Sequence, residues 1–272
     1  MGKFSGVLIV SDIDGTLYDS MGRLSEENRE ALTYFKSEGG LFTMASGRTF
    51  PDVKLIDNKL HLANTALIGN NGAVVGQNGK ALWQCRFDER LAATIELLLA
   101  NGDYFDAEFF TAEYIAAYRV NEFTELHKKY VADRFVYITS LDDIPSDTAM
   151  VAFWMDKDRI ADFKALFARL GLDEQYAAFQ GFTYAYEMVP KGHGKGEAAL
   201  RLKEMTGCHT LVCAGDSGND VSMLQAADLS FAPCSAMAEA KAAAKITLTR
   251  SCDESIYPEI LEIVQNTRDI RA

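Results

Sequence analysis

Residues 7–17 read VLIVSDIDGTL, an apolar run followed directly by two aspartates and a glycine. Four consecutive apolar residues, 7–10, are typical of a parallel strand that is buried on both faces. In an extended backbone, residues two apart point the same way, so Asp12 and Asp14 are predicted to face one site at the strand's end. Gly15 allows a tight turn and leaves main-chain N–H groups free for an anion. Two such carboxylates indicate a Mg²⁺ site, and the alternative is a solvated acidic turn.

Strands and helices alternate on both sides of a long middle segment. Before it, a helix begins at Ser25 and ends at Gly39-Gly40, and a second strand covers residues 41–45. After it, the pattern predicts helices over 195–206, 219–227, 236–244 and 255–264, separated by strands over 210–214, 229–232 and 246–249. This alternation predicts an α/β fold, a Rossmann-like parallel-sheet core wrapped by helices, with ligands at the carboxyl ends of the strands.

The middle segment differs in composition. Residues 82–188 hold 21 of the 29 aromatic residues but only three of the 20 glycines. Its pattern predicts an α+β unit, with helices over 88–100, 121–132 and 158–170 among several strands. We therefore expect a catalytic core over residues 1–81 and 189–272, with 82–188 as an inserted domain. The alternative is an uneven composition within a single domain.

Charge and cysteine usage exclude several classes of protein. The formal net charge is −12, which disfavours binding to nucleic acids and anionic membranes. The five cysteines contain no CxxC pair, which argues against a disulfide framework or a zinc site. The first apolar run stops at Ser11, too early for an export signal. We expect a cytoplasmic protein, a monomer or weak homo-oligomer, without nucleic-acid or membrane partners.

Two further clusters carry phosphate-binding groups. Ser46, Gly47 and Arg48 end the second strand with a hydroxyl, a flexible backbone and a guanidinium; the alternative is a helix-capping serine beside a surface arginine. Residues 191–196 read KGHGKG before a helix. They match neither a Walker A loop nor a dinucleotide fingerprint, which leaves Lys195 at a helix start, or a solvated loop.

The fourth cluster follows the strand at 210–214 and reads GDSGND over residues 215–220. Asp216 lies at the strand's end and is a candidate third oxygen ligand. Asp220 enters the next helix, where its charge favours the helix dipole, so it is equally a simple capping acid. Three histidines, including His127, are isolated in the sequence and are read as surface or core residues.

In this order the four clusters resemble the motifs of the haloacid dehalogenase (HAD) superfamily. Asp12 to Thr16 fits the first motif, Ser46 the second, Lys195 the third, and residues 215–220 the fourth. Only 29 residues, 17–45, separate the first motif from Ser46, but 148 separate Ser46 from Lys195, so the inserted cap belongs in the second interval. This arrangement resembles the Cof-type, C2-capped branch, as does the turn at 71–73. Residues 233–236 depart from that branch's usual loop.

The resemblance implies a mechanism and a site. Asp12 would attack phosphorus, and Asp14 would act as acid and then base. Mg²⁺ would bind to Asp12, the Asp14 carbonyl and Asp216. The expected phosphate and substrate contacts are Gly15, Ser46, Gly47, Arg48, Lys195 and Asn219, and Asp220 would orient Lys195.

The implied activity is Mg²⁺-dependent hydrolysis of small phosphorylated metabolites, mostly sugar phosphates. The alternatives are a sugar phosphomutase of the same superfamily and a phospho-accepting regulator without turnover. Against the regulator stands Asp14, because a long-lived aspartyl-phosphate has no use for a neighbouring acid and base. A dehalogenase has no use for Asp14 or for a metal.

Overall fold

The computed structural model describes residues 2–131 and 134–271 of the 272-residue chain. The core sheet has five parallel strands in the order β14-β13-β12-β1-β2. Their bounds are β1 (Val7–Ser11), β2 (Leu41–Met44), β12 (Thr210–Ala214), β13 (Leu229–Ala232) and β14 (Ile246–Thr247). Ser11 pairs with Met44 on one side and with Ala214 on the other, so three neighbouring strands end together. The predicted α/β fold with a parallel core sheet is confirmed.

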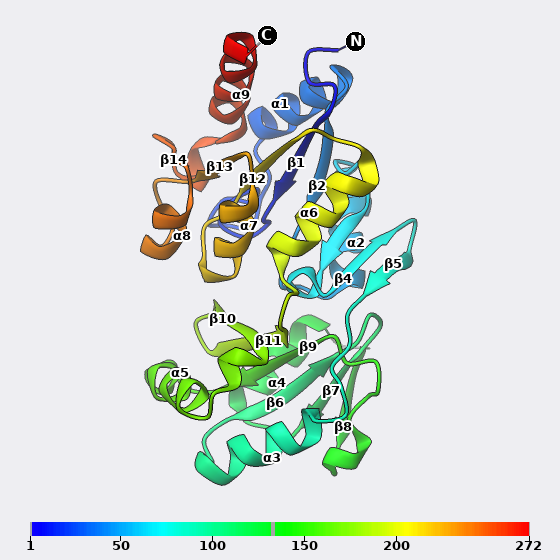
Figure 1. Cartoon of the computed structure of the whole chain (residues 1–272), viewed down its shortest axis with the longest axis vertical. Coiled ribbons are helices and arrows are strands. Elements are labelled where there is room, and N and C mark those ends of the chain that lie inside the picture. The colour runs from blue at the N-terminus through cyan, green and yellow to red at the C-terminus, as the bar shows by residue number, and fades with distance from the viewer. Residues whose placement is uncertain (1, 132–133, 272) are drawn as a thin grey trace.

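Both faces of this sheet are buried because side chains alternate along β1. Val7 and Ile9 belong to one apolar cluster, and Leu8 and Val10 to another. The first cluster includes residues of α1 and α9, and the second includes residues of α6 and α7. The core helices in Figure 1 are α1 (Glu26–Ser37), α6 (Lys195–Thr206), α7 (Val221–Ala226), α8 (Ala238–Ala243) and α9 (Tyr257–Arg271). The continuous apolar run is thus explained by helices on both sides.

Between β2 and the inserted segment lie a helix and a small sheet that the apolar pattern does not predict. Helix α2 (Phe50–Leu60) begins after Thr49, whose side chain accepts a hydrogen bond from the N–H of Asp52. An antiparallel sheet contains β3 (Leu67–Gly69), β4 (Val74–Gln77) and β5 (Lys80–Gln84). The turn η1 (Asn70–Gly72) joins β3 to β4 with three positive φ angles, of 50°, 51° and 91°. Asparagine and glycine are the residues that adopt this conformation most readily.

The inserted segment contains a separate six-stranded sheet, called the cap sheet below, in the order β10-β11-β9-β6-β7-β8. Neighbouring strands are antiparallel except β7 and β8, which are parallel. Their bounds are β6 (Asp106–Phe110), β7 (Ile115–Tyr118), β8 (Phe135–Ile138), β9 (Met150–Trp154), β10 (Tyr176–Phe182) and β11 (Ala185–Pro190). A parallel core with a mainly antiparallel second sheet agrees with the expected architecture.

The two faces of the cap sheet have different neighbours. Helices α3 (Leu91–Asn101) and α5 (Ile160–Arg169) pack on one face, against alternate residues such as Phe109 and Phe153. Helix α3 lies at the opposite end of the molecule from α9 (Figure 1). Phe110 and Trp154, which point the other way, belong to the apolar cluster that also includes core residues. That second face, together with α4 (Glu122–Val131), therefore borders the core.

Some predicted boundaries change in the structure. The helix expected over 219–227 consists of the 3₁₀ turn η6 (Gly218–Asp220) followed by α7, because Ser217 and Asp220 form a capping box there. The helix expected over 121–132 ends at Val131, and residue 132 lies outside the described residues. All five cysteines are free thiols. Within residues 2–131 and 134–271, no helix has the length and apolar character needed to cross a membrane.

Candidate active site

The chain that leaves β1 brings Asp12 against a fully buried lysine. Nζ of Lys195, the first residue of α6, lies 2.6 Å from Oδ1 of Asp12 and 2.7 Å from Oδ1 of Asp220. Burial disfavours the charge of Lys195, but the two carboxylates outweigh this effect and raise its pKa. Lys195 is therefore a fixed positive charge that joins the loops after β1 and β12.

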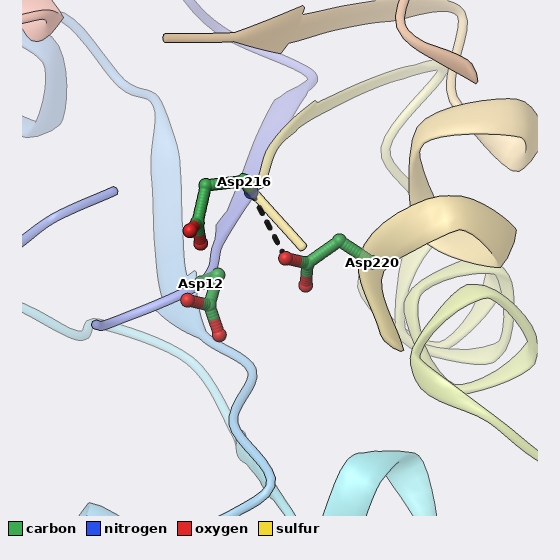
Figure 2. A group of neighbouring side chains, drawn as sticks. All are labelled: Asp12, Asp216 and Asp220. Carbon is green, nitrogen blue, oxygen red and sulfur yellow. Dashed lines mark hydrogen bonds between the residues drawn. The ribbon is translucent and has the colours of Figure 1, made fainter. Parts of the chain in front are cut away.

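Asp216 completes the acidic cluster (Figure 2). Its carboxylate accepts a hydrogen bond from Oγ1 of Thr16 at 3.3 Å. Its main-chain N–H donates to Oδ2 of Asp220 at 3.0 Å, the bond dashed in Figure 2, and the N–H of Ser217 donates to the same oxygen at 3.1 Å. Both oxygens of Asp220 are thus engaged by Lys195 and two amides, which suits an orienting role.

The cluster has the geometry and charge of a cation site. Oxygens of Asp12, Asp216 and Asp220 lie within 4.8 Å of one another. Burial and the neighbouring acids raise the pKa of Asp12 well above its usual value in spite of Lys195. Burial and Asp220 raise the pKa of Asp216 to about 6. Three carboxylates face one lysine here, so a divalent cation that prefers oxygen ligands fits this donor set.

Gly15 is required where the loop after β1 passes Asp216. Its φ is +79°, and a Cβ at this position would lie 2.6 Å from Oδ2 of Asp216. A side chain here would therefore strain the backbone and push the two loops apart. The tight turn expected from the sequence is one reason for a glycine at position 15, and the close approach to Asp216 is a second.

Asp14 lies apart from this cluster. The strand ends at Ser11, so the extended geometry expected to align Asp12 with Asp14 does not continue beyond it. The Asp14 carboxylate accepts two hydrogen bonds from Arg48, at 2.8 Å from Nε and 2.9 Å from Nη2. Both side chains are about half exposed, with 45% of Asp14 and 40% of Arg48 accessible. Arg48 thus holds Asp14 in a two-point ion pair at the edge of the site.

Ser46 and Gly47 lie at the end of β2, beside the turn η1. Ser46 is buried, and its Oγ accepts a hydrogen bond from the N–H of Arg48 at 3.2 Å. The alternative that Ser46 caps a helix is wrong, because Thr49 caps α2. A Cβ on Gly47 would lie 3.1 Å from Nδ2 of Asn71, so the glycine leaves room for that side chain.

Asn71 connects the core site to the cap sheet, a role that was not predicted from the sequence. Its Oδ1 accepts from Nδ2 of Asn219 at 2.9 Å, and its Nδ2 donates to Oε2 of Glu187 at 2.7 Å. Glu187 lies on β11 and is buried, and burial raises its pKa to about 7. The available signals were the turn at 71–73 and a single acid within the apolar stretch 185–189.

The other polar residues near Lys195 do not join the acidic cluster. Nζ of Lys191 donates to the main-chain oxygen of Asp173. The centroid of the His193 ring lies 5.1 Å from that of Trp83.

The loop over residues 233–236, which departs from the usual pattern of the Cof-type branch, is followed directly by Met237. The N–H of Met237 donates to the Asp216 carbonyl at 2.8 Å. This loop therefore supports the backbone of Asp216.

A cavity of about 190 Å³ lies between the loop after β2 and the cap sheet. Arg48 lines its core side, and Trp154, Glu187 and His127 line its cap side. His127, read from the sequence as isolated, has its Nδ1 at 2.7 Å from Oε2 of the buried Glu108. The sequence offered no signal for this pair, because the two residues lie on different elements, β6 and α4.

Comparison with known proteins gives consistent results. Residues 9–260 match the haloacid dehalogenase-like hydrolases. The chain is 25% identical to YxeH of Bacillus subtilis (strain 168), over 94% of this chain and 98% of that protein. It is 26% identical to the 5-amino-6-(5-phospho-D-ribitylamino)uracil phosphatase YwtE of the same organism, covering 91% and 94%. The structure of the HAD subclass IIB sugar phosphatase BT4131 matches with a TM-score of 0.79 and 19% identity, covering 95% and 99%.

Proposed function

The chain belongs to the haloacid dehalogenase-like hydrolases, and we propose that it hydrolyses small phosphorylated metabolites, above all sugar phosphates, through an aspartyl-phosphate on Asp12. Like its relatives it is a phosphatase that acts on phosphate monoesters. The observation that carries the proposal is the contact between Asp12 and the buried Lys195, beside Asp216. A buried carboxylate held at a strand's end in this way is oriented for attack, and forming a covalent intermediate divides a difficult displacement into two easier ones.

The proposed role of Asp12 is in-line attack by a carboxylate oxygen on phosphorus, which breaks the bond to the leaving oxygen. Mg²⁺, held by Asp12, the Asp14 carbonyl and Asp216, would neutralise charge between the nucleophile and the phosphoryl group when bound. Lys195 contributes a second positive charge next to the carboxylate of Asp12, and its contact with Asp220 keeps it in place. Uncatalysed phosphate-monoester hydrolysis is extremely slow, so this concentration of positive charge is essential.

Asp14 is proposed to transfer protons. It first protonates the leaving oxygen and then accepts a proton from the water that attacks phosphorus and breaks its bond to Asp12. In the structure both of its oxygens are bonded to Arg48, so proton transfer requires at least one of these bonds to open. Opening also frees the guanidinium for phosphoryl oxygens, together with Ser46 and Gly47.

The remaining groups of the site bind the phosphoryl oxygens. We assign this role to the main-chain amides near Gly15 and to Asn219, whose amide side chain is already held by Asn71. We propose that residues 1–81 and 189–272 act as the catalytic core and that 82–188 act as the cap that selects substrate. The net charge of −12 supports a protein that binds neither nucleic acid nor anionic membranes, and we propose that it is a cytoplasmic monomer or weak homo-oligomer.

The test is a panel of phosphorylated metabolites assayed for released phosphate with Mg²⁺ and with excess chelator. We expect phosphate release that requires Mg²⁺, because three acids with one lysine need a further cation. Full activity in chelator would contradict the metal assignment. A phosphosugar isomer formed without free phosphate would instead identify a phosphomutase.

A further inference from the structure

The cavity between the core and the cap sheet is positioned to bind the leaving group, which is the part of the substrate that departs with the ester oxygen. Arg48, which bonds Asp14, lines its core side, and Glu187 lines its cap side. Glu187 is joined through Asn71 to Asn219. The cavity therefore adjoins the proposed phosphoryl site on two sides. The leaving group of a bound substrate would contact the cap wall, the part of the cavity lined by residues of the cap sheet and α4. This argument rests on the proposed function.

The cap wall of the cavity is rich in aromatic rings that pack against one another. The ring of Trp154 stacks on that of His127 at a centroid distance of 4.7 Å and an angle of 27°. The ring of Phe182 also stacks on that of Trp154, at a centroid distance of 6.2 Å and an angle of 25°. Phe110 packs at 5.9 Å from the His127 ring. Such a surface suits a ligand with a compact, partly apolar face, provided that polar groups at its edges are also satisfied.

The polar groups of this wall are acceptors with spare capacity. Glu187 accepts only the hydrogen bond from Asn71 among the described residues, through Oε2, so Oε1 remains available. Nδ1 of His127 is taken by Glu108, which leaves Nε2 as the ring nitrogen open to a ligand. Behind the wall, Oε1 of Glu108 and Nε1 of Trp154 are buried and form no well-aligned hydrogen bond in the described part of the chain. Trp154 is nevertheless close enough to Glu108 to lower its pKa, so these two groups face each other and not the cavity.

The cavity is also acidic. Its two nearby guanidinium groups are already paired, Arg48 with Asp14 and Arg134 with Asp52. Within residues 2–131 and 134–271, no lysine or arginine forms an ion pair with Glu187 or Glu108. Burial raises the pKa of Glu187 to about 7, so this carboxylate is ionised above that pH. A second anionic group on the substrate would then meet a carboxylate that pairs with no lysine or arginine among the described residues, and like charges in a poorly solvated site repel strongly. Hydroxyl groups, in contrast, can donate to Glu187 and to His127.

We propose that Glu187 and His127 are specificity-determining residues that bind hydroxyls of a neutral, hydroxyl-rich leaving group and exclude leaving groups that carry a second anion. Glu108 is a positioning residue, because it holds the His127 ring through Nδ1 and so directs Nε2 to the ligand. The aromatic rings of Trp154 and Phe182 supply the apolar surface against which the leaving group packs.

The test uses a matched pair of compounds, glucitol 6-phosphate and 6-phosphogluconate, which differ at C1 as CH₂OH against carboxylate. Each is measured at pH 8, where Glu187 is ionised, as a substrate and as a competitive inhibitor of p-nitrophenyl phosphate hydrolysis. We expect the wild-type protein to favour glucitol 6-phosphate by more than about tenfold. Glu187→Gln should reduce this preference several-fold, whereas Glu122→Gln, a neutralised acid on the exposed side of α4, should not alter it.

Equal affinity for the two compounds, or no inhibition by either, would overturn the proposal while leaving the phosphatase mechanism intact. Failure to hydrolyse p-nitrophenyl phosphate with Mg²⁺ would instead reject the proposed function. For Glu108, we expect Glu108→Gln to raise KM for the polyol phosphate with little change in kcat. In the His127→Ala background the same substitution should have no further effect on KM. Independent, additive effects of the two changes would show that Glu108 does not act through His127.

Discussion

Asp12 and Asp220 in the core share the buried Lys195, whereas Glu108 and Glu187 on the cap sheet have no lysine or arginine partner among the described residues. The core carboxylates lie in loops at the ends of parallel strands and converge within 4.8 Å with Asp216. The cap carboxylates lie on strands and bond to neutral groups or a histidine. We interpret the core arrangement as a site organised to bind a cation and a phosphoryl group. The cap carboxylates, which lack a compensating lysine or arginine among the described residues, are suited to discriminate between ligands of different charge.

The largest effect is expected from Asp12→Asn, which tests whether the core cluster carries the chemistry. An amide is not a nucleophile, so kcat should fall more than about a thousandfold, a loss of roughly 4 kcal/mol or more in transition-state stabilisation. The measurement is steady-state phosphate release, with circular dichroism to confirm folding. Asp19→Asn, a change of another acid in the same loop that pairs with Arg23, is the control. Retention of more than a thousandth of kcat would rule out covalent catalysis by Asp12.

Lys195→Met should show how strongly the acidic cluster of the core depends on this buried lysine. Removing one partner of a buried ion pair typically costs about 3–5 kcal/mol, because the other charge is left uncompensated. We expect this loss in chemical denaturation without metal and a partial recovery with Mg²⁺, which binds the folded state. Lys191→Met, an exposed neighbour, should have little effect. Unchanged stability would mean that the acids are protonated or solvated without Lys195.

Glu187→Gln tests the cap carboxylate by pH. Burial raises the pKa of Glu187 from 4.5 to about 7, so between these values the folded protein keeps a proton that the unfolded chain has released. Stability from this group is therefore present below pH 4.5 and lost as pH rises through 7. Relative to wild type, the glutamine variant should gain about 2 kcal/mol in free energy of unfolding between pH 5 and pH 8. A pH-independent difference would mean that Glu187 is ionised throughout.

Local patterns predicted the core well. The apolar run before Asp12 is β1, and Ser25 caps α1 by accepting from the N–H of Asn28 at 3.1 Å. These features depend only on residues that are close together in the sequence, so local sequence patterns are sufficient to predict them. Helix α2 was not predicted, although its signals, the capping Thr49 and Pro51 in the first turn, are present in the sequence.

The cap wall could not be predicted in the same way. An acid in a strand, such as Glu108 or Glu187, is ordinarily read as part of a solvated face, and Glu108 lies 19 residues before His127 in the sequence. Their burial results from packing between the cap sheet, α4 and the core. Likewise the ion pair of Arg48 with Asp14 joins residues 34 apart, which spacing alone does not reveal.

The measurement that tests the central claim most directly is the fate of phosphate on Asp12 in an Asp14→Asn variant. This change keeps the main-chain carbonyl proposed to bind Mg²⁺ but removes the base for hydrolysis, and such catalysis is worth about 10²–10⁴-fold. With p-nitrophenyl phosphate, whose leaving group needs little protonation, phosphorylation should suffer less than hydrolysis. We predict that mass spectrometry detects one phosphate on the peptide that contains Asp12. Turnover of this substrate at the wild-type rate, without a phosphoenzyme, would contradict the mechanism.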